Sequence, residues 1–410
     1  MKILLITDYG TPTGGAEILT IALRDGLRSR GHDARLFASS ARPLNSQSQA
    51  DYHCLGTTSS FRTVLQSANI HAYLKLKAVL AEFQPDVVHV TIFLTQLSPL
   101  ILPLLKNIPS LYYAVWYRSI CPTGTKFLPD GTVCQESMGK PCYQNNCLPL
   151  RDWLPLMLQM KLWQRWKDAF DLIVAPSQAV KDALMEAGIQ SVEIVYHGTP
   201  IQSQRSSLTS PPTVVFAGRL VKDKGAEVLL KAFALVVHQM PEARLLLVGD
   251  GPERKSLKQH VIDLQIVDNV SMPGLLSRPE IETLFSTAWV QAVPSLWPEP
   301  FGTVVIEAMM RGTAVVVSAS GGLPELVQIN ETGLVVPPND SEALAASLLL
   351  ILGNRDWAER MGKKAREIAL QRYNENIYID GFLEKYQKIR EMREKRRIAR
   401  SMAPPHRSSG

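Results

Sequence analysis

Two patterns of apolar and polar residues recur along the chain. Short apolar runs are typical of buried strands, and longer stretches with apolar residues three and four positions apart are typical of one face of a helix. In the first half the short runs predict strands at Lys2–Thr7, Ala34–Phe37, Asp86–Val90, Ser110–Val115, Asp171–Ala175 and Glu193–Val195, and the longer stretches predict helices at Ala16–Arg30, Ala72–Phe83, around Leu94–Leu105 and at Ser177–Ala187. This alternation predicts an α/β domain with a doubly wound, parallel sheet.

The second half restarts the same alternation after a linker. The linker runs from Thr199 to Pro212 and is rich in Ser, Pro and Gln, a composition typical of a domain boundary. Beyond it we predict strands at Thr213–Ala217, Arg244–Val248, Val270–Met272, Ala288–Val293 and Ala314–Ser318, and helices at Gly225–Val237, Pro252–Leu264, Glu280–Ser286, Thr303–Met310 and Glu342–Leu352. Two α/β domains of this kind leave a cleft, with ligands at the carboxyl ends of the strands.

Composition supports two domains. The chain has 410 residues, of which 46% are hydrophobic, which is enough for two cores. Its apolar runs are too short to predict a transmembrane helix, and its start resembles a signal peptide only superficially. The net charge is +6, and a basic run lies at Lys385–Arg400. Such a run is typical of a solvated helix end or of a segment that contacts anionic lipid. We expect no nucleic-acid partner. We therefore predict a cytoplasmic protein, with the cytoplasmic face of the inner membrane as an alternative location.

Four of the five cysteines, Cys121, Cys134, Cys142 and Cys147, cluster in a segment that departs from the α/β pattern. In a cytosolic protein such a cluster favours a metal over disulfides, although the usual C-x-x-C spacing is missing. A structural zinc, unlinked thiols and a redox-labile pair all remain open. Asp130-Gly131 predicts a hairpin turn, so we interpret 121–147 as a small insertion.

The stretch Trp153–Trp166 combines tryptophans with Lys161 and Arg165. An amphipathic helix of this composition can lie in a membrane interface. We favour the alternative, that its aromatic side chains pack between the two domains.

Two cations follow the first strand of the second domain. Gly218 permits close approach of the backbone to a ligand, and Arg219 and Lys224 lie just beyond the strand end. A forked guanidinium and a mobile ammonium together suit a diphosphate, although a solvated basic loop has the same composition.

Two carboxylates lie around a proline-rich turn between Val293 and Gly312. Glu299 lies between two prolines and therefore in a loop, whereas Glu307 lies about one turn into a helix that begins near Thr303. A helix start binds anions through its amide groups and its dipole. Glu307 could accept hydrogen bonds from a ribose, and Glu299 could hold sugar hydroxyls; an ordinary loop–helix junction is the alternative.

In the first domain, Gly14-Gly15 opens a helix after the first strand and could present amides to the same phosphates. The fingerprint G-x-G-x-x-G is absent there, which argues against a dinucleotide enzyme. No D-x-D motif occurs, so a catalytic divalent metal is not indicated.

Together these motifs resemble a known family. The strings F-A-G-R-L-V-K-D-K-G, L-V-G-D-G-P-E, V-P-S-L-W-P-E-P-F-G-T-V-V-I-E-A-M-M-R-G and G-G-L-P-E-L-V are similar to those of the retaining GT-B glycosyltransferases of the group 1 and family 4 type. The resemblance implies an α/β, GT-B fold of two Rossmann-like domains and a last helix that crosses back to the first domain. On this basis we divide the chain into an acceptor-side domain (1–200, with the insertion 121–147), a nucleotide-sugar-binding domain (201–372), a returning helix (373–400) and a disordered tail (401–410).

The resemblance also implies an activity, the transfer of a sugar from a nucleotide-diphosphate sugar to a glycan or lipid-linked acceptor, with retained anomeric configuration and no catalytic metal. Arg219 and Lys224 would neutralise the leaving diphosphate, and Glu299 would contact the donor sugar. Gly15, Gly218, Phe301, Gly302, Thr303 and Glu307 would complete the donor site. Peripheral membrane contact is a further expectation.

One position departs from the family. Relatives with the same cysteine segment often carry a histidine six residues before the first Cys-Pro, and this chain has Val115 there. Its absence keeps open a catalytically impaired partner that binds nucleotide sugar. A sugar-nucleotide epimerase of the same architecture is a further alternative, against which the four charged residues of the second domain argue. His89 and His197 are nearby in sequence, and we interpret both as structural.

Overall fold

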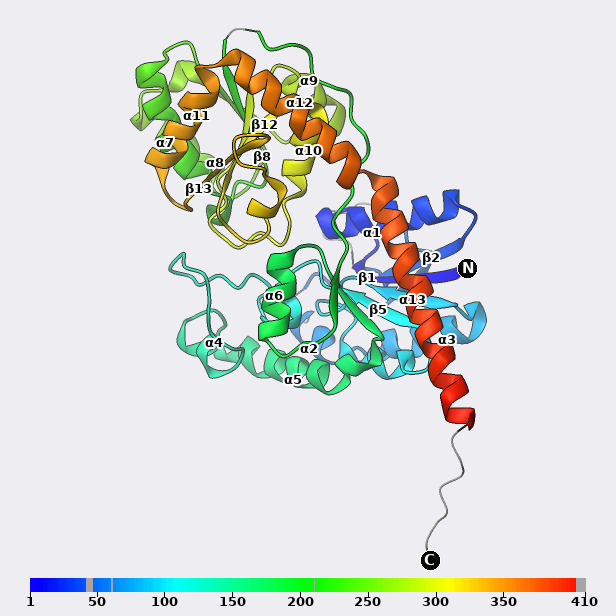
Figure 1. Ribbon diagram of the computed structural model, residues 1–410. Coiled ribbons are helices and arrows are strands. Elements are labelled where there is room, and N and C mark those ends of the chain that lie inside the picture. The colour runs from blue at the N-terminus through cyan, green and yellow to red at the C-terminus, as the bar shows by residue number, and fades with distance from the viewer. Residues whose placement is uncertain (42–46, 60–61, 210, 403–410) are drawn as a thin grey trace, which may run out of the picture.

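The computed structural model describes residues 1–41, 47–59, 62–209 and 211–402. It consists of two α/β domains, one above the other in Figure 1, and a long C-terminal helix that descends from the second domain along the first. The predicted disordered tail, 401–410, lies outside the described residues except for 401 and 402, which end this helix.

A parallel sheet forms the centre of the first domain, with the strand order β3-β2-β1-β4-β5-β6-β7. Side chains of β1 alternate between its faces, so Leu4 and Ile6 join one core and Ile3 and Leu5 another. The strands are β1 (Lys2–Tyr9), β2 (Asp33–Ser39), β3 (Tyr52–Cys54), β4 (Val87–Val90), β5 (Ser110–Tyr113), β6 (Leu172–Ala175) and β7 (Val192–Ile194). The helices are α1 (Gly15–Ser29), α2 (Arg62–Ser67), α3 (Ile70–Phe83), α4 (Lys140–Gln144), α5 (Leu150–Trp166) and α6 (Gln178–Glu186).

The second domain repeats this architecture with the strand order β10-β9-β8-β11-β12-β13, all parallel. Its strands are β8 (Thr213–Ala217), β9 (Arg244–Val248), β10 (Val270–Gly274), β11 (Val290–Val293), β12 (Ala314–Ser318) and β13 (Gly333–Val336). Its helices are α7 (Ala226–Gln239), α8 (Arg254–Asp263), α9 (Arg278–Phe285), α10 (Thr303–Arg311), α11 (Ser341–Leu352) and α12 (Arg355–Arg372). Both sheets confirm the predicted fold class.

The last helix, α13 (Glu375–Met402), returns to the first domain as predicted. Phe382 and Tyr386 are fully buried. The Phe382 ring lies 4.6 Å from the His89 ring and 4.9 Å from the Tyr113 ring, and the Tyr386 hydroxyl lies 2.7 Å from His89 Nδ1. His89 therefore has the structural role that we predicted, as part of the seat of α13.

The aromatic side chain of α5 that is most deeply buried packs within the first domain rather than between the domains, which corrects the favoured interpretation. Trp163 is fully buried, its ring lies 5.6 Å from that of Phe93, and its Nε1 donates a hydrogen bond to the Ser119 carbonyl at 2.8 Å. The opposite face of α5 carries exposed leucines.

Other differences from the predicted elements are local. The helix expected around Leu94–Leu105 is a 3₁₀ helix at Pro99–Leu105, since Pro103 lies within it and disrupts α-helical hydrogen bonding. The elements β3, α2, α4, β13 and α12 were not predicted. The predicted hairpin at Asp130-Gly131 is present, with an antiparallel bridge between Phe127 and Val133.

Candidate functional site

Each sheet reverses its strand order at one point, between β1 and β4 in the first domain and between β8 and β11 in the second. Neighbouring loops diverge there, and ligands bind in the crevice at the carboxyl ends of the strands. Gly218 and Arg219 follow β8, Glu299 follows β11, and Gly15 follows β1. The predicted residues therefore lie at the switch points of both sheets.

Lys224 and Glu299 form the centre of the site. Lys224 Nζ lies 2.5 Å from Glu299 Oε1 and 5.0 Å from the centre of the Trp297 ring. Ser295 Oγ donates a second hydrogen bond to Glu299 Oε1, at 2.7 Å. The Glu299 side chain is 10% exposed and the Lys224 side chain 26% exposed, so the ion pair is partly shielded from water and can still reach a ligand.

The loops that carry this pair are fixed to each other. Leu296 N–H donates to the Asp223 carbonyl at 2.8 Å. Gly225 has φ +70°, and a Cβ at this position would lie 1.9 Å from the Pro294 carbonyl oxygen. Glycine is therefore required for the two loops to approach. Arg219 is exposed at the edge of the same site.

Glu307 lies in the second turn of α10 and pairs with a residue of the neighbouring helix. Arg278 Nη2 lies 3.0 Å from Glu307 Oε1, and both side chains are partly exposed. One oxygen of Glu307 is thus paired with Arg278, a residue that the sequence analysis did not single out.

The start of α10 lies against the segment that links the domains. The buried Phe301 ring is 4.7 Å from the His197 ring and 6.0 Å from the Tyr196 ring. Gly302, at φ +110°, caps the helix, and Thr303 Oγ1 lies 3.3 Å from His197 Nδ1. Burial lowers the pKa of His197 to about 3, so its ring is neutral at pH 7. The first amides of α10 lack partners within the helix and can bind an anion.

Gly15 begins α1, as predicted, and is exposed, but a carboxyl group lies beside it. Glu17 is buried and folds back so that a Cβ at Gly14 would lie 2.9 Å from Glu17 Oε2. Burial raises the pKa of Glu17 to about 7, and hydrogen bonds from the amides of Glu17 and Gly14 oppose that shift. Any phosphate that binds at Gly15 would therefore meet a group that titrates near neutral pH.

One carboxylate of the second domain contacts the first domain directly. Glu325, which follows β12, accepts hydrogen bonds from the amides of Gln178 and Ala179 at 2.8 and 2.7 Å. These amides begin α6 of the first domain, where the helix dipole favours an anion. The carboxyl edges of the two sheets therefore face each other.

The four clustered cysteines are all free, and they line one narrow cavity of about 20 Å³. Among the described residues, no three His, Cys, Asp or Glu side chains are arranged as ligands of a metal ion. The thiols thus converge without forming a ligand set, and zinc stays a prediction.

Val115 is buried in the core of the first domain, among residues that pack against α1 and α13. The nearby Tyr117 is also buried, and it lies close enough to Glu299 and Glu325 that both carboxylates add to the effect of burial in raising its pKa. Tyr117, Ser295, Arg278, Glu17 and Glu325 were not singled out from the sequence. Tyr117, Arg278 and Glu325 act on partners that are distant along the chain, which no local motif reports.

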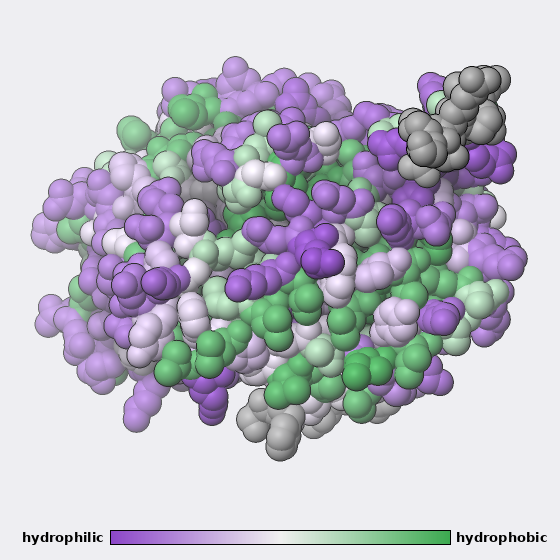
Figure 2. Space-filling view, turned by 90° about the horizontal axis from the view of Figure 1, so that it is seen from below, coloured by the Kyte–Doolittle hydropathy of each residue, from purple (hydrophilic) through white to green (hydrophobic). Residues whose placement is uncertain are grey.

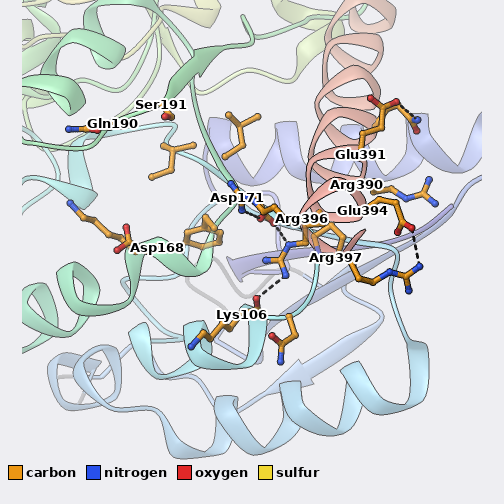
Figure 3. Close-up of a pocket in the computed structure, with 18 of the residues that line it drawn as sticks. Lys106, Asp168, Asp171, Gln190, Ser191, Arg390, Glu391, Glu394, Arg396 and Arg397 are labelled. Atoms are coloured by element: carbon orange, nitrogen blue, oxygen red, sulfur yellow. Dashed lines mark hydrogen bonds and ion pairs between the residues drawn. The ribbon is translucent and has the colours of Figure 1, made fainter. Parts of the chain in front are cut away.

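A cavity of about 1360 Å³ lies at the other edge of the first sheet, under α13 (Figure 3). Asp171, which precedes β6, is 3% exposed; Arg393 Nε lies 2.6 Å from it, and Arg393 also donates to the Lys106 carbonyl at 2.8 Å. These charges pair with one another at the amino ends of the strands. We therefore assign this cavity to the anchoring of α13 and not to the candidate site.

Two family models match the chain. Residues 171–368 match the model described as "Glycosyl transferases group 1", and residues 13–115 match "Glycosyltransferase Family 4". Together these segments cover more than half of the chain. Within the described residues, no helix combines the length and hydropathy needed to cross a membrane.

Curated relatives match part of the chain. A GDP-mannose-dependent alpha-(1-6)-phosphatidylinositol monomannoside mannosyltransferase of Mycobacterium tuberculosis is 34% identical over 170 residues, which are 40% of this chain and 44% of that protein. The sulfoquinovosyl transferase SQD2 of Arabidopsis thaliana is 32% identical over 218 residues, 48% of this chain and 41% of its own. The chain thus spans less than half the length of these relatives.

Solved structures match nearly the whole chain. Sucrose-phosphate synthase of Thermosynechococcus elongatus superposes with a TM-score of 0.73 at 24% identity, covering 95% of this chain and 99% of that one. Anabaena HepE in complex with UDP superposes with a TM-score of 0.69 at 22% identity, covering 95% and 100%. These likenesses confirm the GT-B fold.

Proposed function

Since the chain belongs to the group 1 and family 4 type of glycosyltransferases, we propose that it transfers a sugar from a nucleotide-diphosphate sugar to a glycan or lipid-linked acceptor. We further propose that the anomeric configuration is retained and that no catalytic metal takes part. The observation that carries the proposal is the Lys224–Glu299 ion pair at the β8–β11 switch point.

In this proposal Lys224 and Arg219 act on the leaving group. As the bond between sugar and diphosphate breaks, negative charge develops on the departing phosphate oxygen. A cation that is already in place stabilises this charge more than it stabilises the ground state, and the gain lowers the barrier. Glu299 holds the Lys224 ammonium and Ser295 in turn donates to Glu299, so little reorganisation is needed during the reaction.

The rest of the donor site follows from the same geometry. The amides at the start of α10, at Gly302 and Thr303, would bind phosphate or sugar hydroxyls. Arg278 engages one oxygen of Glu307, which leaves the other oxygen to accept hydrogen bonds from a ribose. Glu299 would contact the donor sugar through the oxygen that faces away from Lys224.

A panel of UDP-, GDP-, ADP- and TDP-sugars tests the proposal. We expect at least one to raise the Tm, because a ligand that binds the folded state stabilises it by mass action. The same donor should release its nucleotide slowly in the absence of acceptor. Glu299→Gln should abolish this release and Glu331→Gln, an exposed control, should not. The anomeric configuration of a transfer product, read by NMR, tests retention.

A second function is favoured by one observation. Val115 is a buried, apolar side chain at the position where, by the family resemblance, relatives with the same cysteine segment often carry a histidine. This favours a partner that binds nucleotide sugar without turnover. A donor that raises the Tm but releases no nucleotide across a panel of acceptors would support this function over the first.

We also propose that the first domain contacts a membrane on its cytoplasmic face. Leu150, Leu154 and Leu158 follow one another at helical spacing along α5 and are exposed. Figure 2, seen from below, shows apolar side chains gathered on this side of the molecule. The Mycobacterium tuberculosis relative is named for a lipid acceptor, which such a surface would help to reach. Co-sedimentation with anionic vesicles should fall for Leu154→Asp/Leu158→Asp, and unchanged sedimentation would contradict the proposal.

A further inference from the structure

A cavity of about 720 Å³ lies beside the candidate site, where the cysteine segment meets α5 and α6. Pro298 and Gly321 of the second domain line it as well. Its volume is in the range of small-molecule sites. The motifs that predicted the donor site do not account for it.

The walls of this cavity are mainly apolar. Trp153 is held in place by a hydrogen bond from its Nε1 to the Gly139 carbonyl at 2.9 Å. Methionine side chains are flexible and adapt to chains of different shape. The apolar side chains include Tyr117, Ile120, Val133, Met138, Trp153 and Met157.

Three lysines, Lys126, Lys140 and Lys161, line the same cavity together with Glu136 and Glu186. Lys140 and Lys161 are exposed, and Lys126 Nζ donates to the Glu136 carbonyl at 3.3 Å. The site therefore combines apolar walls with an excess of cations, a combination that suits an apolar chain bearing an anionic group.

The cavity reaches the residue that we expect to contact the donor sugar. Pro298 directly precedes Glu299, and Gly322 N–H donates to the Glu299 carbonyl at 2.7 Å. Gly321 lies so close to Glu299 that a Cβ there would be 2.2 Å from the same carbonyl oxygen. A molecule in the cavity would thus have one end next to Glu299.

We propose that this cavity is the acceptor subsite and that the acceptor is lipid-linked through a phosphate. The inference rests on the proposed transferase function and names its substrate class. The apolar chain of the acceptor lies along α5, α6 and the cysteine segment, its phosphate contacts the lysines, and its reacting hydroxyl lies at the Pro298 and Gly321 end.

The surface of α5 supports this assignment. Trp153, Met157 and Lys161 line the cavity, and Leu154 and Leu158 are exposed one position further along the helix. The apolar wall of the cavity therefore continues onto the exposed stripe of α5. A lipid chain could therefore pass from a membrane along α5 into the cavity.

Binding of dodecyl phosphate to the full chain, measured by calorimetry below its micelle concentration, tests the inference. Ala183→Trp fills the cavity from α6 and should weaken binding at least about tenfold. Met185→Trp, an exposed residue of the same helix that does not line the cavity, is the matched control and should bind as the wild type does. Far-UV circular dichroism should show that each variant folds.

A second binding experiment tests whether the lysines are needed to bind the phosphate. Lys140→Glu/Lys161→Glu should weaken binding of dodecyl phosphate at least about tenfold and leave binding of dodecanol unchanged, whereas Lys258→Glu, an exposed control in α8, should affect neither.

Equal binding by Ala183→Trp and Met185→Trp, or no binding by a wild-type protein that releases nucleotide from a donor, would overturn the inference. Binding that depends on Ala183 and the lysines, in a protein that neither binds nor hydrolyses any donor, would instead refute the proposed function and leave the lipid-phosphate site in place.

Discussion

Glu17 gives the protein a pH dependence whose direction follows from its burial. Its pKa rises from the ordinary value of 4.5 to about 7 because the folded chain removes the carboxyl from water. Between these values the folded state binds more protons than the unfolded state, so this group lowers stability as the pH rises from about 4.5 to about 7. Above pH 7 the buried carboxylate destabilises the folded state by the full amount, roughly 3 kcal/mol. Below about pH 4.5 this destabilisation is absent. Glu17→Gln keeps a hydrogen-bond acceptor and removes the ionisation.

Urea unfolding of wild type and Glu17→Gln at several pH values measures this effect. The variant should be more stable than the wild type by an amount that grows by roughly 2 kcal/mol between pH 5.5 and 8.5. Glu242→Gln, which replaces an exposed carboxylate, is the matched control. A difference for Glu17→Gln that is flat with pH, or that shrinks as the pH rises, would refute the burial argument.

Three further predictions concern the donor site, the last helix and the cysteines. Lys224→Met should lower kcat for donor hydrolysis by about 10²–10³-fold, as for the loss of one group that stabilises transition-state charge, and Lys222→Met, in the same turn, should change it little; equal rates in both would contradict the assigned role of Lys224. Phe382→Ala should cost about 3–5 kcal/mol of unfolding free energy, because the ring is fully buried between α13 and the first sheet, and a cost below about 1 kcal/mol would show that α13 is not anchored there. Anaerobically purified protein should contain about one zinc per chain by elemental analysis if the four thiols form a ligand set in solution, and its absence would leave them as free thiols or a redox pair.

The sequence places the loops that carry Arg219 and Glu299 at one edge of the sheet for a physical reason. In a parallel α/β sheet every strand ends at the same edge, so the residues after β8 and β11 can be assigned to one edge once both strands are recognised. That β8 and β11 are neighbours in the sheet is shown by the structure. The prolines around Glu299 and the glycine before Arg219 are local signals, and local signals suffice to place loops at an edge. The strands themselves are apolar runs buried on both faces, the clearest pattern in the chain.

Contacts between distant segments could not be predicted in this way. Glu325 binds the start of α6, and Arg278 pairs with Glu307, but nothing near these residues in sequence reports their partners. Trp163 misled the interpretation for the same reason, since a tryptophan in a helix has the same pattern whether it packs inward or against another domain. Only the fold shows that its partner is the Ser119 carbonyl.

The cysteine segment contributes to two cavities that the sequence did not predict. Cys134 and Glu136 line both the narrow cavity of the four thiols and the larger cavity that we assign to the acceptor. The larger cavity has one wall on this segment, and the segment is held by few elements of regular structure beyond its hairpin and the short helix α4. A metal or a disulfide that drew the thiols together would therefore shift Cys134 and change the shape of the acceptor wall, while Lys224 and Glu299, fixed to each other on the second domain, would stay in place. Oxidation or metal removal should accordingly affect acceptor affinity before it affects donor hydrolysis.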